Sequence, residues 1–191
     1  LGQLALANHD RVWAGVFAEG LADEFPAARG RKAIPQLFQF LERQTASGES
    51  TQLEVAVGQF TAGLQQRGLV VILSDMFDAG KFDAAIDTLR LQGFEPLLIH
   101  VIDPMEPDPR LDGKVALAAV EGVGSYNVTI DEQDRCHFSD AFEEASRRVR
   151  GYFHRYGLGV VPVFADESVT RCLERIVLGS VQRRHTRAGV R

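Results

Sequence analysis

The chain has 191 residues, of which 45% are hydrophobic and 25% are charged, and its formal net charge is −5. This composition is ordinary for a globular protein, and the acidic balance gives no support to a general nucleic-acid-binding role. No apolar run approaches the roughly twenty residues that a membrane helix needs. The two cysteines, Cys136 and Cys172, lack CxxC spacing. They indicate reduced thiols, so we expect a cytoplasmic protein.

The first residue is Leu1 rather than methionine. We therefore expect an upstream segment that would contain any targeting sequence. Residues 1–181 are expected to form one domain, incomplete at its N-terminus, because this length suffices for one sizeable core. Residues 182–191 are rich in arginine and are expected to form a basic, flexible tail.

The first third of the chain predicts a β-hairpin followed by two amphipathic helices. In chain order, the expected elements are a helix end over Leu1–Ala7, a strand over Arg11–Leu21, a short edge strand near Ala22–Phe25, a loop over Pro26–Gly30, and helices over Lys32–Thr45 and about Thr51–Gln66. The predicted buried face of the first amphipathic helix consists of Ile34, Leu37, Phe38 and Leu41.

The strand that organises the sequence lies within Gly68–Asp78. It begins with an unbroken apolar run, Leu69–Leu73, which is mostly β-branched and is typical of a strand buried on both faces of a parallel sheet. The run ends in Ser74 and Asp75, followed by Asp78. In open α/β sheets, ligands bind outside the carboxyl ends of the strands, so both acids are candidate ligand-binding residues. The alternative is that one of them caps the next helix.

The rest of the chain alternates helices and strands, which is typical of a doubly wound, mostly parallel α/β domain. The expected elements are a helix over Phe82–Gln92 closed by Gly93, a strand over Pro96–Ile102, a loop over Asp103–Asp112, two short strands over Val115–Val120 and Tyr126–Ile130 joined by a turn at Gly122–Gly124, a helix over Phe138–Tyr156, a strand over Val160–Ala165, and a helix over Ser168–Leu178.

Other candidate residues carry weaker signals. His100 lies within a predicted buried strand and is expected to be a hydrogen-bonded core residue rather than a metal ligand. The remaining histidines show no metal-ligand spacing, and the chain contains neither a G-x-S-x-G motif nor a P-loop. Trp13 either belongs to the core or contacts a partner, and the sequence leaves both open.

Five short motifs occur in an order that is similar to a known family. They are H-D-R-V-W-A-G-V-F-A at residues 9–18, R-G-R-K at 29–32, G-E-S-T-Q-L at 48–53, V-V-I-L-S-D-M-F-D at 70–78 and I-H-V-I-D-P at 99–104. From about Leu4 to Leu178 the chain resembles the domain of unknown function 58 family, which belongs to the von Willebrand factor type A-like group. The resemblance implies a Rossmann-like domain with a metal-ion-dependent adhesion site. It also implies association with MoxR-type AAA+ ATPases in the assembly or maturation of protein complexes. Relatives often carry membrane segments upstream, so the resemblance implies that the parent could associate with a membrane through segments before Leu1.

The resemblance also implies which residues would bind the metal. Thr51 matches the threonine that the group's second loop supplies, and Asp75 matches the aspartate of the third loop. The Asp-x-Ser-x-Ser motif of the first loop is absent from this sequence, and Gln52 replaces a common aspartate. Two oxygen ligands cannot hold Mg²⁺ firmly, so we expect Mg²⁺ binding in the full-length parent and weak or no binding in this chain. Thr51 can equally cap its helix in a capping box with Glu54.

Two functions follow from these observations. The favoured one is a non-enzymatic interaction module that docks a partner carboxylate through a bound metal ion. The alternative is a metal-dependent hydrolase in which Asp75 and Asp78 orient a metal-bound water. The first is favoured because the sequence presents no recognisable general base, nucleophile or second acidic cluster.

In the group that the chain resembles, the first strand lies between those that correspond here to Arg11–Leu21 and Gly68–Ser74. This chain begins after that strand. We therefore expect a break in pairing between the two remaining strands, and an isolated chain that is marginally stable or self-associates through unpaired strand edges.

Overall fold

The computed structural model describes the chain apart from residues 46–49, 64–65, 77–81, 108, 119–124 and 189–191, and apart from the side chains of residues 117–118, 125 and 179–188. The chain divides into two compact units. Unit 1 consists of Leu1–Gln65 and Asp78–Thr88, and unit 2 consists of Gln66–Phe77 and Leu89–Arg191. The expectation of a single domain over residues 1–181 stays a prediction.

Unit 1 is built on an antiparallel hairpin with short helices. Its elements are α1 (Gly2–Ala7), β1 (Arg11–Phe17), β2 (Leu21–Arg29), the 3₁₀ turn η1 (Arg31–Ala33), α2 (Ile34–Glu42) and α3 (Leu53–Gly63). The hairpin was predicted, but its first strand was predicted too long, because β1 ends at Phe17. Its second strand was predicted too short, because β2 continues to Arg29 within the expected loop. Proline fits here because β2 pairs with β1 alone among the described residues, and the β1–β2 register shifts between Val12 and Ala14.

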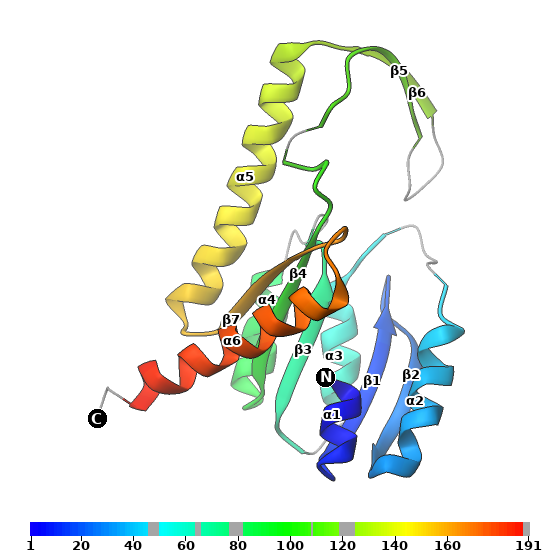
Figure 1. Cartoon of the computed structure of the whole chain (residues 1–191), viewed down its shortest axis with the longest axis vertical. Coiled ribbons are helices and arrows are strands. Elements are labelled where there is room, and N and C mark those ends of the chain that lie inside the picture. The colour runs from blue at the N-terminus through cyan, green and yellow to red at the C-terminus, as the bar shows by residue number, and fades with distance from the viewer. Residues whose placement is uncertain (46–49, 64–65, 77–81, 108, 119–124, 189–191) are drawn as a thin grey trace. The chain divides into compact units, whose positions relative to one another are not determined.

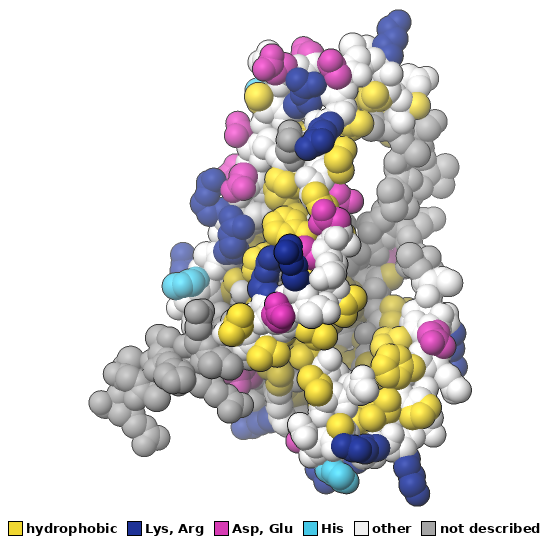
Figure 2. All heavy atoms as spheres, viewed as in Figure 1, with side chains coloured by type: hydrophobic (Ala, Val, Ile, Leu, Met, Phe, Trp, Pro, Cys, Tyr) yellow, Lys and Arg dark blue, Asp and Glu magenta, His cyan; other side chains and the backbone are white. Residues whose placement is uncertain are grey.

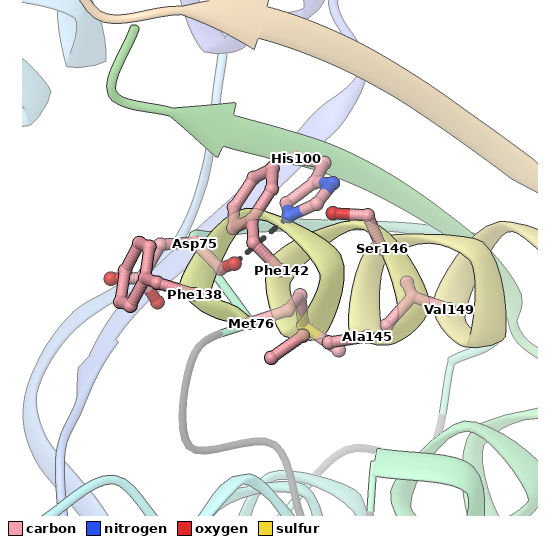
Figure 3. Close-up of a pocket in the computed structure, with 9 residues that line it drawn as sticks. Asp75, Met76, His100, Phe138, Phe142, Ala145, Ser146 and Val149 are labelled. Carbon is pink, nitrogen blue, oxygen red and sulfur yellow. Dashed lines mark hydrogen bonds between the residues drawn. The ribbon is translucent and has the colours of Figure 1, made fainter. Parts of the chain in front are cut away.

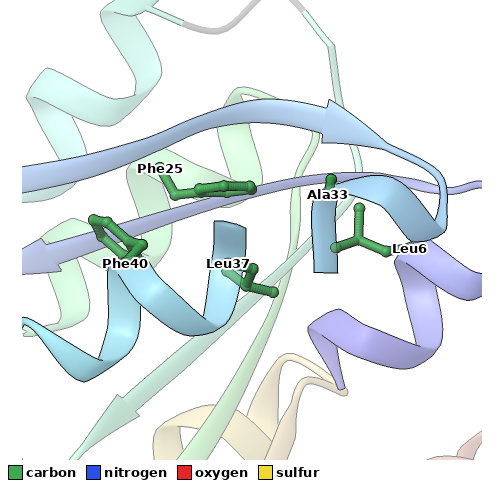
Figure 4. Close-up of a cluster of buried hydrophobic side chains, with 5 residues drawn as sticks. All are labelled: Leu6, Phe25, Ala33, Leu37 and Phe40. Carbon is green, nitrogen blue, oxygen red and sulfur yellow. The ribbon is translucent and has the colours of Figure 1, made fainter. Parts of the chain in front are cut away.

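The core of unit 1 lies between the hairpin, α1 and α2 (Figure 4). Its buried side chains are Leu6, Phe25, Ala33, Leu37 and Phe40. The predicted buried face of α2 was wrong in part, because Phe38 and Leu41 are 45% and 50% exposed whereas Phe40 is 3% exposed. Helical spacing allows two overlapping stripes that share Leu37, and the stripe through Phe40 faces the Phe25 ring, with the ring centroids 6.0 Å apart.

Trp13 belongs to the packing of unit 1. Its ring centroid lies 4.8 Å from that of Phe60 in α3, and its indole N–H donates to Glu24 Oε2 at 3.0 Å. Gly15, two residues along the same strand, leaves room for the indole, because a Cβ built there would lie 2.2 Å from the Trp13 ring. The contacts of Trp13 thus place it against the inner face of α3.

Unit 2 contains a parallel three-stranded sheet in the order β3-β4-β7 (Figure 1). Its elements are β3 (Leu69–Ser74), the end of α4 (Phe82–Leu91), β4 (Glu95–Ile102), β5 (Gly113–Ala118), β6 (Ser125–Ile130), α5 (Glu132–Arg155), β7 (Gly159–Phe164) and α6 (Val169–Ala188). β5 and β6 form a separate antiparallel pair, as predicted. The turn expected at Gly122–Gly124 lies outside the described residues. This parallel sheet flanked by helices confirms the predicted α/β class and is consistent with a von Willebrand A-like fold.

The middle strand, β4, carries the core of unit 2. Five of its side chains are buried in succession from Pro96 to His100, and the cluster that it forms with β7 and α6 comprises Leu97, Ile99, Val161, Val163 and Ile176.

The prediction that β3 is buried on both faces was wrong, because Leu69 and Leu73 are 62% and 61% exposed. β3 has one neighbouring strand among the described residues. An apolar run shows that a strand is hydrophobic, but it does not show how many other elements pack against that strand. β1 and β3 belong to different units, so the expected break in pairing between them stays a prediction.

The helix ends show which local signals were read correctly. The predicted buried face of α4 is confirmed, since Phe82, Ala85, Ile86 and Leu89 are at most 2% exposed. Gly93 closes this helix at φ 82°, and its N–H donates to the Arg90 carbonyl. α5 begins six residues before the predicted start at Phe138, because its first turn is capped (Asp131 accepts from the Asp134 N–H, and Asp134 from the Asp131 N–H).

α6 continues to Ala188, beyond the predicted end at Leu178. The helix therefore includes residues 182–188 of the expected tail, whose flexibility stays a prediction. On its exposed side, Val169, Leu173 and Val177 recur every four residues, and Figure 2 shows apolar side chains over this helix. None of the helices in the described part of the chain is long and apolar enough to cross a membrane.

Candidate functional site: a pocket beside the carboxyl ends of β3 and β4

The parallel register brings the carboxyl ends of β3 and β4 to one edge of the sheet. Ser74, the last residue of β3, pairs with His100, and Asp75 follows directly and is exposed. Asp103 stands in the equivalent place after β4. The predicted position of Asp75, at the carboxyl edge of a parallel sheet, is therefore confirmed.

A pocket of about 220 Å³ lies between these strand ends and helix α5 (Figure 3). The strand side contributes Asp75, Met76 and His100. The helix contributes Phe138, Ala141, Phe142, Ala145, Ser146 and Val149. These helical residues recur at intervals of three and four, so they share one face of α5. The lining is thus mostly apolar, with polar groups at the rim and at the base.

Helix α5 is held over the pocket by polar contacts near its N-terminus. The Ser139 hydroxyl donates to the Pro107 carbonyl at 2.7 Å, and the Arg135 guanidinium donates to the Leu111 carbonyl at 3.2 Å. Further along the helix, Val149 and Phe153 are buried. The same helix therefore closes one side of the pocket and anchors the loop that follows β4.

His100 forms the base of the pocket and is 3% exposed. Its Nε2 lies 2.9 Å from the Asp75 carbonyl oxygen. Because a carbonyl can only accept, Nε2 carries the proton, and in the neutral ring Nδ1 is then an acceptor. Nδ1 has no hydrogen-bond partner in the described structure, and the Ser146 hydroxyl points toward the ring (Figure 3). The prediction that His100 is a hydrogen-bonded core residue is confirmed.

The environment of His100 favours the neutral imidazole. Burial is the largest cause and lowers the pKa of His100 below its ordinary value, and the nearby Arg150 charge lowers it further. The hydrogen bond to the Asp75 carbonyl and the Asp75 charge act in the opposite direction. His100 therefore fixes the Asp75 peptide as an uncharged donor.

The backbone immediately after Asp75 is strained. Met76 adopts φ 58°, a left-handed conformation that costs a residue with a Cβ about 1–2 kcal/mol. Its N–H donates to the Ser74 hydroxyl at 3.0 Å, and its side chain is 7% exposed within the pocket. Contacts on both sides of the peptide thus hold a turn that places the Asp75 side chain at the rim.

Two acids that sequence reasoning did not single out join Asp75 at this edge. Asp103 accepts from the Met105 N–H at 2.8 Å, and Glu106 accepts from the Asp103 N–H at 2.9 Å. Burial raises the pKa of Glu106, and the negative charges of Asp75 and Asp103 raise it further. Glu106 therefore lies close enough to Asp75 and to Asp103 to be repelled by both. The position of Asp103, directly after the second apolar strand, was the available signal in the sequence.

The predicted metal ligands lie in different units. Thr51 precedes α3 in unit 1, whereas Asp75 follows β3 in unit 2, so their convergence stays a prediction. Asp78 lies outside the described residues. The capping alternative for Thr51 is wrong, because α3 begins at Leu53 and the Gln52 carbonyl accepts from the Ala56 N–H. Gln52 thus holds the N-cap position.

The described residues contain no group of three or more His, Cys, Asp or Glu side chains arranged to hold a metal ion. Thr51 and Asp75 together offer one hydroxyl and one carboxylate, whereas Mg²⁺ prefers about six oxygen ligands. The acids near Asp75 accept backbone hydrogen bonds in the turn after β4: Glu106 accepts from the Asp103 N–H and Asp103 accepts from the Met105 N–H. Metal binding by Thr51 and Asp75 therefore stays a prediction.

Comparison with known proteins places the chain in a family. No curated protein matches it. A solved structure, titled as the conserved hypothetical protein BatB from Bacteroides thetaiotaomicron, is similar with a TM-score of 0.52 and 13% sequence identity, over 93% of this chain and 80% of that chain. At this identity the likeness supports the α/β fold. The model of the family described as "Protein of unknown function DUF58" matches residues 1–150. The chain therefore belongs to the DUF58 family.

Proposed function

We propose that this chain is a non-enzymatic protein-interaction module of the von Willebrand A-like kind. Its partner would be a MoxR-type AAA+ ATPase, and its role the assembly or maturation of protein complexes. The observation that carries the proposal is the pocket beside the carboxyl ends of β3 and β4, which is mostly apolar and has Asp75 in its lining. Open α/β sheets bind their ligands at this edge, and apolar pockets with a few polar groups are typical binding sites.

The same residues give less support to the hydrolase alternative. Within the pocket, Ser146 and His100 come nearest to a nucleophile and its base. Each is 3% exposed, and no hydrogen bond joins the Ser146 hydroxyl to the unpartnered His100 Nδ1. A substrate would have to displace helix α5 to reach them. The docking function is therefore favoured.

The proposal includes a metal ion in the full-length parent. Thr51 and Asp75 would hold Mg²⁺, with water and the partner completing its oxygen ligands. A bound Mg²⁺ would supply a direct electrostatic contact to a partner carboxylate. The residues of this chain would position that contact, since His100 and Ser74 fix the turn that presents Asp75.

The test is the affinity of the full-length parent for a MoxR-type ATPase, measured by isothermal titration calorimetry with Mg²⁺ and with EDTA. We expect Asp75→Ala to weaken binding about tenfold or more, and the exposed control Glu174→Ala on α6 to leave it unchanged. Unchanged affinity in a folded Asp75→Ala variant would contradict docking through Asp75. Metal-dependent turnover of a phosphate or ester substrate that Asp75→Ala abolishes would instead establish the hydrolase.

A further inference from the structure

One end of the hairpin in unit 1 concentrates positive charge. Arg11, the first residue of β1, pairs with Arg29, the last residue of β2, so their side chains lie on one face of the hairpin. Arg31 and Lys32 follow in the turn η1. All four side chains are exposed, and Figure 2 shows Lys and Arg side chains at this end of unit 1. The chain as a whole has a net charge of −5, so this end differs in sign from the rest.

The backbone keeps these residues close to one another. Gly30 adopts φ 79°, a left-handed conformation that favours glycine, and the chain turns there from β2 into η1. A Cβ added at Gly30 would lie 4.0 Å from the His9 ring atom Cδ2, so the histidine that precedes β1 lies beside the same turn. We call this group of side chains the basic end of the hairpin, and it consists of His9, Arg11, Arg29, Arg31 and Lys32.

Three of these cations are not compensated by acids of the chain. Among the described residues, no ion pair or hydrogen bond involves the side chains of Arg29, Arg31 and Lys32. Arg11 has an interaction of its own, so ligand contacts are assigned to the other three. Asp10 is the only acid in the segments 9–11 and 29–32. The basic end therefore presents net positive charge to solvent.

The chemistry of these side chains favours a short acidic ligand. The planar guanidinium of arginine donates two parallel hydrogen bonds to a carboxylate, which adds geometric selectivity to the attraction of charge. At physiological ionic strength, exposed charges interact mainly within about 8 Å. A short acidic segment therefore meets the basic end alone, whereas a long polyanion such as nucleic acid also meets the acidic remainder of the chain.

We propose that the basic end of the hairpin binds an acidic segment of a partner protein, in which two or three Asp or Glu residues are adjacent. This inference rests on the proposed role of the chain as a protein-interaction module and adds the charge of a segment that the module binds. The guanidinium groups of Arg29 and Arg31 donate to the carboxylates, and Lys32 adds a third cation. The contact needs no residue of unit 2.

The test uses the whole chain and the peptide acetyl-Gly-Glu-Asp-Glu-Gly-amide. The peptide is titrated while the backbone amides of β1, β2 and α2 are followed by NMR. We expect saturable shifts at the basic end and weaker binding as the ionic strength rises, because salt screens exposed charges. The uncharged peptide acetyl-Gly-Gln-Asn-Gln-Gly-amide should not bind.

Variants of the chain locate the site. Arg29→Gln and Arg31→Gln should each weaken binding of the acidic peptide about threefold, and together about tenfold. Asp10→Asn removes the neighbouring negative charge and should strengthen binding about twofold. The matched control Arg171→Gln removes an exposed arginine on α6 and should have no effect. None of these variants should lower the melting temperature, which separates a binding role from a structural one.

Inorganic phosphate is titrated separately, because arginine also binds phosphate groups. We expect phosphate to compete with the peptide only at concentrations above those at which the peptide itself saturates. Saturation by phosphate at lower concentration would assign the basic end to a phosphorylated ligand and overturn the acidic segment.

The proposal is also overturned if the peptide shifts do not saturate, if the uncharged peptide binds equally well, or if the double arginine variant behaves like Arg171→Gln in folded chains. These outcomes are separable from the ATPase experiment. A parent protein that binds the ATPase while the chain does not bind the peptide keeps the proposed function and loses the acidic segment. A chain that binds the peptide, in a parent that does not bind the ATPase, keeps the basic end as a site and loses the proposed partner.

Discussion

β3 and β4 are parallel neighbours with similar composition, yet their burial differs. Both are dominated by valine, leucine and isoleucine, and their residues pair one to one from Leu69 with Glu95 to Ser74 with His100. In β4, Leu98 is fully buried, whereas Leu73 in β3 is 61% exposed. β4 has a strand on each side, and β3 has one among the described residues. Burial in this sheet therefore follows from the number of covering neighbours rather than from the residues of the strand.

The largest expected effect tests this comparison directly. Leu98→Ala truncates a fully buried side chain, and should lower the free energy of unfolding by about 2–5 kcal/mol. Leu73→Ala removes the same atoms from an exposed position and should change it by less than about 0.5 kcal/mol. Urea unfolding followed by circular dichroism measures both values. Equal losses would show that β3 is covered in solution, as it would be if another strand or a second copy paired with the edge that has no strand partner among the described residues.

Two glycines in unit 1 show the same dependence on neighbouring side chains. Gly15→Ala in β1 forces a Cβ to 2.2 Å from the Trp13 ring, which Phe60 and Glu24 hold in place. We expect this crowding to destabilise the chain by about 1–3 kcal/mol. Gly58→Ala in α3 meets nothing within 4 Å and should stabilise the helix by about 0.5–1 kcal/mol.

Thermal unfolding of the two glycine variants gives the sign of each change. If Gly15→Ala were neutral, the indole would have to move freely, and the contacts of Trp13 with Phe60 and Glu24 would not restrain it. Tryptophan fluorescence separates these cases, because a displaced indole changes its emission even where stability does not change.

Much of the fold was predictable because the decisive signals are local. The buried face of α4 and its closure at Gly93 follow from helical periodicity and a left-handed glycine. The early start of α5 was missed although Asp131 and Asp134 stand at capping-box spacing. The face of α2 and the exposure of β3 were misjudged for another reason, because both depend on which elements cover them.

Some features of the candidate site were likewise predictable from local sequence, and others depend on how distant elements pack. The place of Asp75 at a strand end and the core position of His100 follow from the sequence of each strand. The pocket does not, since it needs α5 to cross those strand ends with Phe142 and Ala145 on the facing side. The repulsion between Glu106 and Asp75 likewise depends on the parallel register that brings two loops together.

The smallest expected effect is a dependence of the free energy of unfolding on pH, caused by the buried His100 in β4. Burial lowers its pKa in the folded chain below the ordinary value of 6.5, so the unfolded chain binds this proton at a higher pH than the folded chain. Unfolding therefore takes up a proton between that value and the lower folded pKa. The stability that neutral His100 contributes is complete above about pH 6.5 and is lost as the pH falls through the folded pKa.

A substitution at His100 isolates this contribution. His100→Gln keeps an N–H donor for the Asp75 carbonyl and does not titrate, so its free energy of unfolding should fall less than that of the wild type between about pH 7.5 and about pH 5.5. His137→Gln, at an exposed position on α5, should retain the wild-type pH dependence. Equal losses in the wild type and His100→Gln would mean that His100 is protonated without cost in the folded chain. Its burial would then be relieved in solution, and β4 would be less covered at its carboxyl end than the comparison with β3 requires.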